Sequence, residues 1–80
     1  MEIDMIIEEL KRIIEDIADI SADEINGDSS MIDDLDLSSL EIMSIISEVE
    51  KKFPVKISED EMLSISTVKE LSEIIGEKSN

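Results

Sequence analysis

Residues 33–43 read Asp33-Asp34-Leu35-Asp36-Leu37-Ser38-Ser39-Leu40-Glu41-Ile42-Met43, and this run decides the fold. An acidic stretch passes here directly into an apolar helix. The pattern Ser38-x-x-Glu41 is a capping box, in which the serine hydroxyl accepts an early backbone N–H and the glutamate reaches back to the cap. Ser39 then lies in the first helical turn, beside free backbone N–H groups and the positive end of the helix dipole, where a phosphate is stabilised.

Apolar residues that recur every three or four positions predict a helix on each side of this run. The helix over residues 39–53 has an apolar stripe formed by Ile42, Ile45, Ile46, Val49 and Phe53. Pro54 ends it, because the residue before a proline is disfavoured in the α conformation. The helix over residues 2–19 has a stripe formed by Ile3, Ile6, Ile7, Leu10, Ile13, Ile14 and Ile17. Residues 20–32 are predicted to form a long ordered loop, anchored in the core by Ile20, Ile25, Met31 and Ile32.

Two further capping boxes follow in the C-terminal part of the chain. Ser58-x-x-Glu61 opens a short helix over residues 59–64, and Thr67-x-x-Glu70 opens a last helix over residues 67–76. The last helix turns inward the apolar residues Val68, Leu71, Ile74 and Ile75. Gly76 is expected as its C-terminal cap, with a frayed tail over residues 77–80. No β pattern is present, so residues 1–80 are predicted to form one all-α domain, a small four-helix bundle with a long loop between its first two helices.

Composition excludes several classes of function. The chain has 22 acids and 7 bases, a net charge of −15, so nucleic-acid binding is excluded and basic partners are expected. It has no Cys and no His, which removes disulfides, thiolate metal sites and catalytic triads. No stretch is long enough to span a bilayer, and the acidic start does not suit a signal peptide. We expect a cytoplasmic monomer that is not an enzyme.

Ser39 allows two interpretations from the local sequence. Because the chain offers no histidine base, another enzyme would have to activate the hydroxyl, so a modified serine fits better than a catalytic one. The plainer alternative is that Ser38 and Ser39 are only N-caps. The acidic run at 33–36 lacks the ligand spacing and turn glycine of a calcium loop, so we predict solvated surface and no metal site.

The run Asp34-Leu35-Asp36-Leu37-Ser38-Ser39-Leu40-Glu41 resembles the D-L-x-x-D-S-L-(D/E) signature of the acyl carrier protein family. Further similarity extends over most of the chain, at residues 31–35, 50–53, 57–61 and 65–68. The resemblance implies a discrete, specialised member in which a phosphopantetheinyl transferase attaches 4′-phosphopantetheine from coenzyme A to Ser39. The arm would carry acyl groups as thioesters to fatty-acid, polyketide or related biosynthetic enzymes. Supporting motif positions are Asp34, Leu35, Asp36 and Ser38.

The resemblance also implies that partner enzymes dock on the second helix through basic patches. The docking residues expected from it are Leu40, Glu41, Met43, Ser44, Ser47, Glu48 and Glu50. Four positions depart from the family: Ser38 replaces the usual Asp, Asp36 replaces a glycine and is expected to change the loop backbone, and Ser44 and Lys51 replace acids. They favour a specialised carrier whose partners are acyl-transfer, ligase or synthase enzymes of its own. The alternatives are a non-carrier acidic interaction module and a carrier of aminoacyl or D-alanyl cargo.

Overall fold

The computed structural model describes residues 2–79, which form four α-helices and one short 3₁₀-helix. The elements in chain order are α1 (Ile3–Ala18), η1 (Ala22–Glu24), α2 (Ser39–Lys52), α3 (Glu59–Ser64) and α4 (Val68–Lys78). Within the described range, the β-type pairing is limited to an isolated bridge between Ser30 and Thr67. The predicted all-α class with a long loop after the first helix is confirmed.

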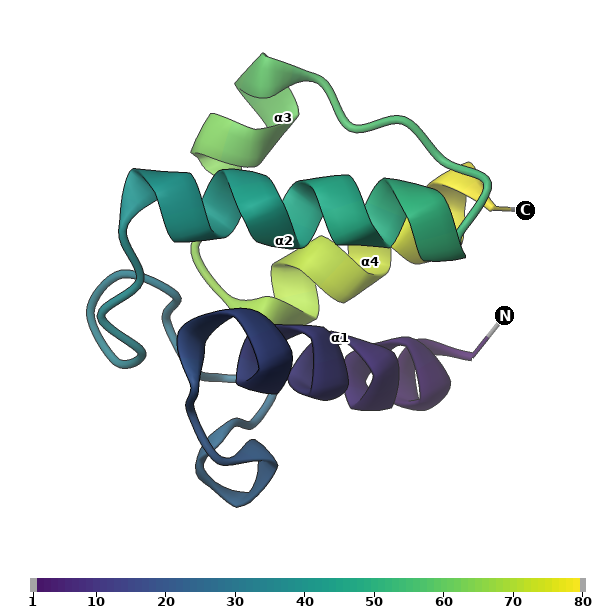
Figure 1. Cartoon of the computed structure of the whole chain (residues 1–80). Coiled ribbons are helices and arrows are strands. Elements are labelled where there is room, and N and C mark those ends of the chain that lie inside the picture. The colour runs from purple at the N-terminus through teal and green to yellow at the C-terminus, as the bar shows by residue number, and fades with distance from the viewer. Residues whose placement is uncertain (1, 80) are drawn as a thin grey trace.

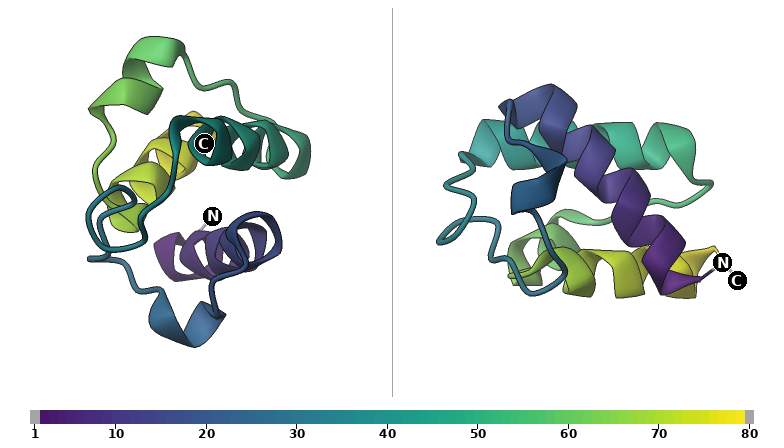
Figure 2. Two further views of the ribbon diagram at one scale, coloured as in Figure 1. Left: turned by 60° about the vertical axis from the view of Figure 1, so that its left-hand side comes forward. Right: turned by 90° about the horizontal axis from the view of Figure 1, so that it is seen from below.

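Helix α1 packs against both α2 and α4, and the core lies between these three helices (Figure 1). Fully buried side chains on the facing stripes are Ile6, Leu10 and Ile14 of α1, Ile45 and Val49 of α2, and Val68, Leu71 and Ile75 of α4. Each such side chain contributes about 1.5–3 kcal/mol by leaving water. The first turn of α1 and the last turn of α4 lie at one end of the bundle, and α2 begins at the opposite end (Figure 2).

Short helix α3 is attached mainly by the linkers that flank it. It contains no buried residue of its own, and Met62 is its partly buried contact with the core. The linkers bury Val55 and Ile57 before the helix and Ile65 after it. Helix α3 therefore lies over the bundle as a separate surface element (Figure 1).

The long loop is fixed to the start of α4 by backbone hydrogen bonds. The Met31 N–H donates to the Ser66 carbonyl at 3.0 Å, and the Val68 N–H donates to the Ser29 carbonyl at 3.2 Å. Ile25 and Met31 are buried as predicted, and Ile20 is partly buried. The prediction for Ile32 is wrong, since this side chain is 62% exposed. A turn begins at Met31, so the next residue faces away from the core.

Helix α4 runs past the glycine that was expected to end it. Gly76 is buried within the helix, which continues to Lys78, so the predicted cap at Gly76 and the predicted fraying at 77–78 are wrong. A Cβ at Gly76 would lie 3.3 Å from Ile3 Cδ1 and 3.6 Å from Ile6 Cδ1, so the glycine serves the close approach of α4 to α1. Residue 80 lies outside the described residues.

We predict that Gly76→Ala raises the free energy of unfolding by about 0.5 kcal/mol. Alanine has a helix propensity about 1 kcal/mol better than glycine. Part of that gain is offset because the half-buried Ile3 side chain must shift by a few tenths of an ångström. Gly76→Leu should instead lower the free energy by at least about 1 kcal/mol through overpacking. Urea denaturation measures both, and a leucine variant as stable as the alanine variant would contradict the close packing.

Candidate functional site

Ser39 is the first residue of α2 and its side chain is exposed. The preceding Ser38 caps the helix: its Oγ accepts the Glu41 N–H at 3.2 Å, and its own N–H donates to Glu41 Oε1 at 2.9 Å. This capping box holds the Ser39 backbone in place without using the Ser39 hydroxyl. Between residues 2 and 79 no hydrogen bond engages that hydroxyl, so it is free to react.

Backbone N–H groups beside Ser39 are suited to an anion. The capping box satisfies the Glu41 N–H, and the Ile42 N–H donates to the Ser38 carbonyl at 3.0 Å. The N–H groups of Ser39 and Leu40 have no acceptor within the described residues. Together with the positive end of the helix dipole, they fit a phosphate attached to Ser39 Oγ.

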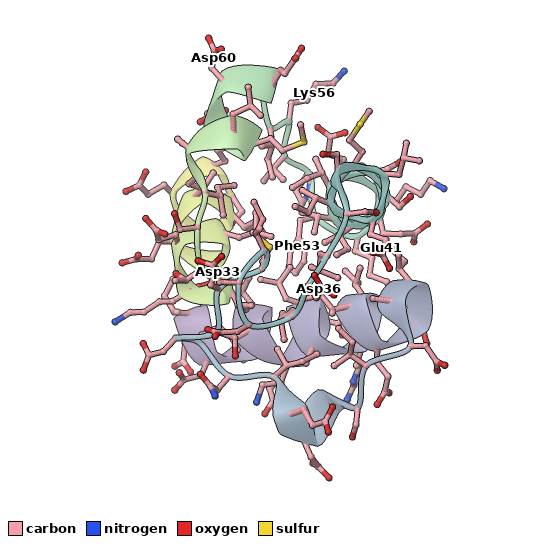
Figure 3. All side chains as sticks on the ribbon, turned by 90° about the vertical axis from the view of Figure 1, so that its left-hand side faces the viewer. Asp33, Asp36, Glu41, Phe53, Lys56 and Asp60 are labelled. Atoms are coloured by element: carbon pink, nitrogen blue, oxygen red, sulfur yellow. The ribbon has the colours of Figure 1, made fainter. Side chains whose placement is uncertain are left out.

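The loop before Ser39 crosses the end of the bundle with two leucines turned inward. Leu35 and Leu37 are buried, and the Leu37 N–H donates to the Met31 carbonyl at 2.9 Å. Asp36 between them adopts the left-handed conformation, with φ of 53°. Aspartate here occupies a conformation that glycine favours, and the change of loop backbone expected from Asp36 stays a prediction. Figure 3 faces this end of the molecule and shows Asp33 and Asp36 on the loop in front of the helices.

The apolar side chains expected to meet a partner lie on the solvent side of α2. Leu40 is 76% exposed and Met43 is 53% exposed, although both are large apolar side chains. Next to Met43, a groove of about 310 Å³ runs between α2 and α3. It is lined by residues of both helices and of the linker between them: Met43, Ile46, Ser47, Glu50, Ile57, Ser58, Glu59 and Met62.

The polar residues expected on this surface differ in what they contact. Ser44 and Ser47 are exposed. Glu48 Oε1 lies 3.5 Å from Lys51 Nζ, and Glu50 Oε2 accepts the Ile57 N–H at 2.9 Å. Glu50 thus fixes the linker that leads to α3, a structural role that the sequence pattern did not reveal. Asp34, a motif position, likewise accepts the Ser30 N–H at 2.8 Å.

Glu61 ties α3 to the end of α4. Its Oε1 accepts the Ser58 N–H at 3.0 Å and lies 3.0 Å from Lys78 Nζ. The backbone hydrogen bond from Ser58, followed by the hydrogen bond from Lys78, lowers the pKa of the Glu61 carboxyl below its ordinary value of 4.5. The pair joins two segments that sequence reasoning had not connected.

Other kinds of site can be assessed for residues 2–79. In that part of the chain, no three carboxylates converge in an arrangement that could hold a metal ion. Its helices are also all too short or too polar to cross a bilayer.

Comparisons with known proteins agree with this geometry. The phosphopantetheine attachment site family matches residues 8–75. The acyl carrier protein of Petrotoga mobilis is 36% identical over 77 residues, which cover 96% of this chain and 91% of that protein. The acyl carrier protein of Coprothermobacter proteolyticus is 35% identical over 75 residues, covering 94% and 92%. A solved structure of acyl carrier protein from Enterococcus faecalis superimposes with a TM-score of 0.80 at 28% identity, covering 99% of this chain and all of that one.

We predict that Asp36→Ala lowers the free energy of unfolding by about 1 kcal/mol, whereas Asp36→Gly raises it by about 0.5 kcal/mol. Alanine is strained at a φ of 53°, and glycine is not. Asp36→Asn, which tolerates this conformation, separates the loss of charge from the strain. Urea denaturation at two salt concentrations makes the comparison, and an alanine variant as stable as the glycine variant would refute the left-handed backbone.

For the contact between α3 and the end of α4, we predict that Lys78→Gln raises the pKa of Glu61. The pKa should stay below its ordinary value, because the Ser58 N–H still donates to the carboxylate. Since the pKa is lowered in the folded protein, the stabilisation from Glu61 is present above its unfolded pKa and is lost as pH falls through the folded value. NMR titration of the carboxyl carbon measures the change. Lys69→Gln is the matched control, and an unchanged Glu61 pKa in the Lys78 variant would disprove the contact.

Proposed function

The chain belongs to the acyl carrier proteins, and we propose that Ser39 is the residue to which its phosphopantetheine arm is attached. Members of this family carry acyl groups for other enzymes and are not catalysts themselves; their covalent cofactor is 4′-phosphopantetheine. The observation that carries the assignment is the free, exposed Ser39 hydroxyl at the start of α2, next to two unused backbone N–H groups.

Each neighbouring residue has a separate part in this proposal. The Ser38–Glu41 capping box keeps the first turn of α2 ordered while a transferase works on Ser39. The chain has no histidine, so we assign the base that removes the Ser39 proton to the transferase. The amides of Ser39 and Leu40 then accommodate the charge of the phosphodiester. When attached, the arm supplies a terminal thiol that holds the acyl group as a thioester.

We further propose that acyl cargo shelters in the groove between α2 and α3. The groove begins beside Met43 and continues to Met62, and both side chains are unbranched and adaptable. Its lining contains no aromatic ring that would block a flexible chain. Helix α3, which has no buried residue, can move to widen it.

Partner enzymes are proposed to dock on α2 beside Ser39. The exposed Leu40 and Met43 offer the apolar contact that a transient enzyme complex needs. The phosphopantetheinyl transferase and the acyl-transfer, ligase or synthase enzymes would share this surface. Ser44 and Lys51 support a specialised set of partners, because they alter the charge of the surface that those enzymes meet.

The attachment site is tested by intact-mass measurement after incubation with coenzyme A and a broad-specificity phosphopantetheinyl transferase. We expect one arm on the native chain and none on Ser39→Ala. Ser21→Ala, an exposed serine in the loop after α1 and outside the proposed docking surface, is the matched control and should accept the arm as the native chain does. Circular dichroism verifies that the Ser39 variant keeps its helices.

Two results would contradict the assignment. An arm that still attaches to Ser39→Ala would place the modification on another residue, with Ser38 the first to examine. A native chain that accepts no arm from any of several transferases would instead favour an interaction module that has kept the fold without the modification.

A further inference from the structure

The outward ridge of α2 carries no acidic residue, although the chain has a net charge of −15. At about 100° per residue, the positions opposite the buried stripe fall on one line along the helix. These ridge residues, all exposed, are Leu40, Ser44, Ser47 and Lys51. A partner that lies along α2 from Ser39 therefore meets an apolar side chain, two hydroxyls and an ammonium group.

Two of the acids that flank the ridge are already engaged within the molecule. Glu41 accepts the Ser38 N–H and Glu50 accepts the Ile57 N–H. A base on a partner would have to share these carboxylates with existing bonds. By contrast, Asp33 and Asp36 at the Ser39 end are exposed and make no ion pair within residues 2–79.

Exposed bases gather at the other end of the same surface. The side chains of Arg12 and Lys51 are 75% and 71% exposed, and that of Lys52 is 51% exposed. A groove of about 430 Å³ separates α1 from α2 here and is lined by Arg12, Ile13, Asp16, Ile17, Ser44, Ser47, Glu48 and Lys52. Glu9 lies 3.5 Å from Arg12 and 3.8 Å from Lys52. Two bases thus share the Glu9 carboxylate at this end and Lys51 adds a third base, whereas the run at 33–36 near Ser39 holds three acids and no base.

We propose that Lys51 is a specificity residue that selects partner enzymes bearing an acidic side chain at the facing position and disfavours partners bearing a base there. The inference rests on the proposed role of Ser39, because it places the docked enzyme along α2. Lys51 follows Leu40 by eleven positions, which is about 17 Å along the helix. The acidic group of the partner would therefore lie about 17 Å from the partner's apolar contact with Leu40. Bases on the partner would be confined to the Ser39 end, opposite Asp33 and Asp36.

The weak Glu48–Lys51 pair does not prevent this contact. It is an exposed pair three residues apart on one helix, at 3.5 Å, and such pairs contribute little in water. Covering it with a partner carboxylate would give Lys51 a second acceptor. The opposite charges at the two ends of α2 would also fix the direction in which a partner lies along the helix, since a reversed complex would set like charges against each other.

Charge reversal on both sides of the interface tests the proposal. The probe is a broad-specificity phosphopantetheinyl transferase, together with variants in which each surface Arg or Lys around its active site is replaced singly by Glu. The kcat/KM of arm transfer is measured on the native chain, Lys51→Gln, Lys51→Glu and the control Lys69→Glu, which makes the same charge change on α4.

At one transferase position we expect the Glu variant to act on the native chain with kcat/KM raised at least about threefold. On Lys51→Glu, the same transferase variant should have a lower kcat/KM than the unaltered transferase. The ratio of the two kcat/KM values should be intermediate on Lys51→Gln, and on Lys69→Glu it should equal the ratio on the native chain. The difference should vanish near 1 M salt, where the Debye length is about 3 Å. Circular dichroism verifies the fold of each carrier variant.

The proposal is overturned if every transferase variant changes kcat/KM by the same factor on the native chain and on Lys51→Glu, because Lys51 then does not face the enzyme. It is equally overturned if Lys69→Glu shows the same coupling as Lys51→Glu. A native chain that accepts no arm at all would mark a failure of the Ser39 assignment itself and is therefore distinguishable from a failure at Lys51.

Discussion

Burial of the loop side chains Met31, Leu35 and Leu37 is the constraint on which the Ser39 end of the molecule depends. These residues close the end of a core that is otherwise built by three helices. These side chains are packed in the core, and the loop is also hydrogen-bonded to the start of α4. Together these contacts fix the path of the backbone that leads to Ser38. The site is thus positioned by apolar packing beneath it, while its own side chains remain free for chemistry.

Helices and loop differ in how much their sequence reveals. Periodic isoleucines predicted α1 and α2, and the three Ser/Thr-x-x-Glu patterns all form capping boxes in the structure. Inside the loop no period relates one side chain to the next, so the exposure of Ile32 could not be foreseen, whereas the glycine that the family has at position 36 was a signal for the left-handed Asp36. Gly76 was misassigned for a related reason. Its role is the close approach of α4 to α1, and α1 is distant in sequence.

Several of the acids that give the chain its charge accept hydrogen bonds from its own backbone N–H groups. Carboxylates of Glu41, Glu61 and Glu70 complete the capping boxes, and Glu15 and Glu50 accept backbone N–H groups of the loop and of the α2–α3 linker. Each helix start leaves backbone N–H groups without a partner inside the helix. A high acid content therefore satisfies hydrogen-bond donors as well as providing solubility. It also explains why acidic positions in the sequence alone overstated the number of carboxylates free to meet a partner.

The placement of the helix ends has a consequence for how this domain can be joined to other proteins. The first turn of α1 and the last turn of α4 lie together, and Ser39 lies at the opposite end of α2, a helix of 14 residues that is about 20 Å long. A linker attached at either end would leave from the side of the molecule opposite to Ser39, the proposed attachment residue. A tethered copy could then pivot about that side and present Ser39 to several enzymes in turn, without the tether crossing the docking surface proposed on α2.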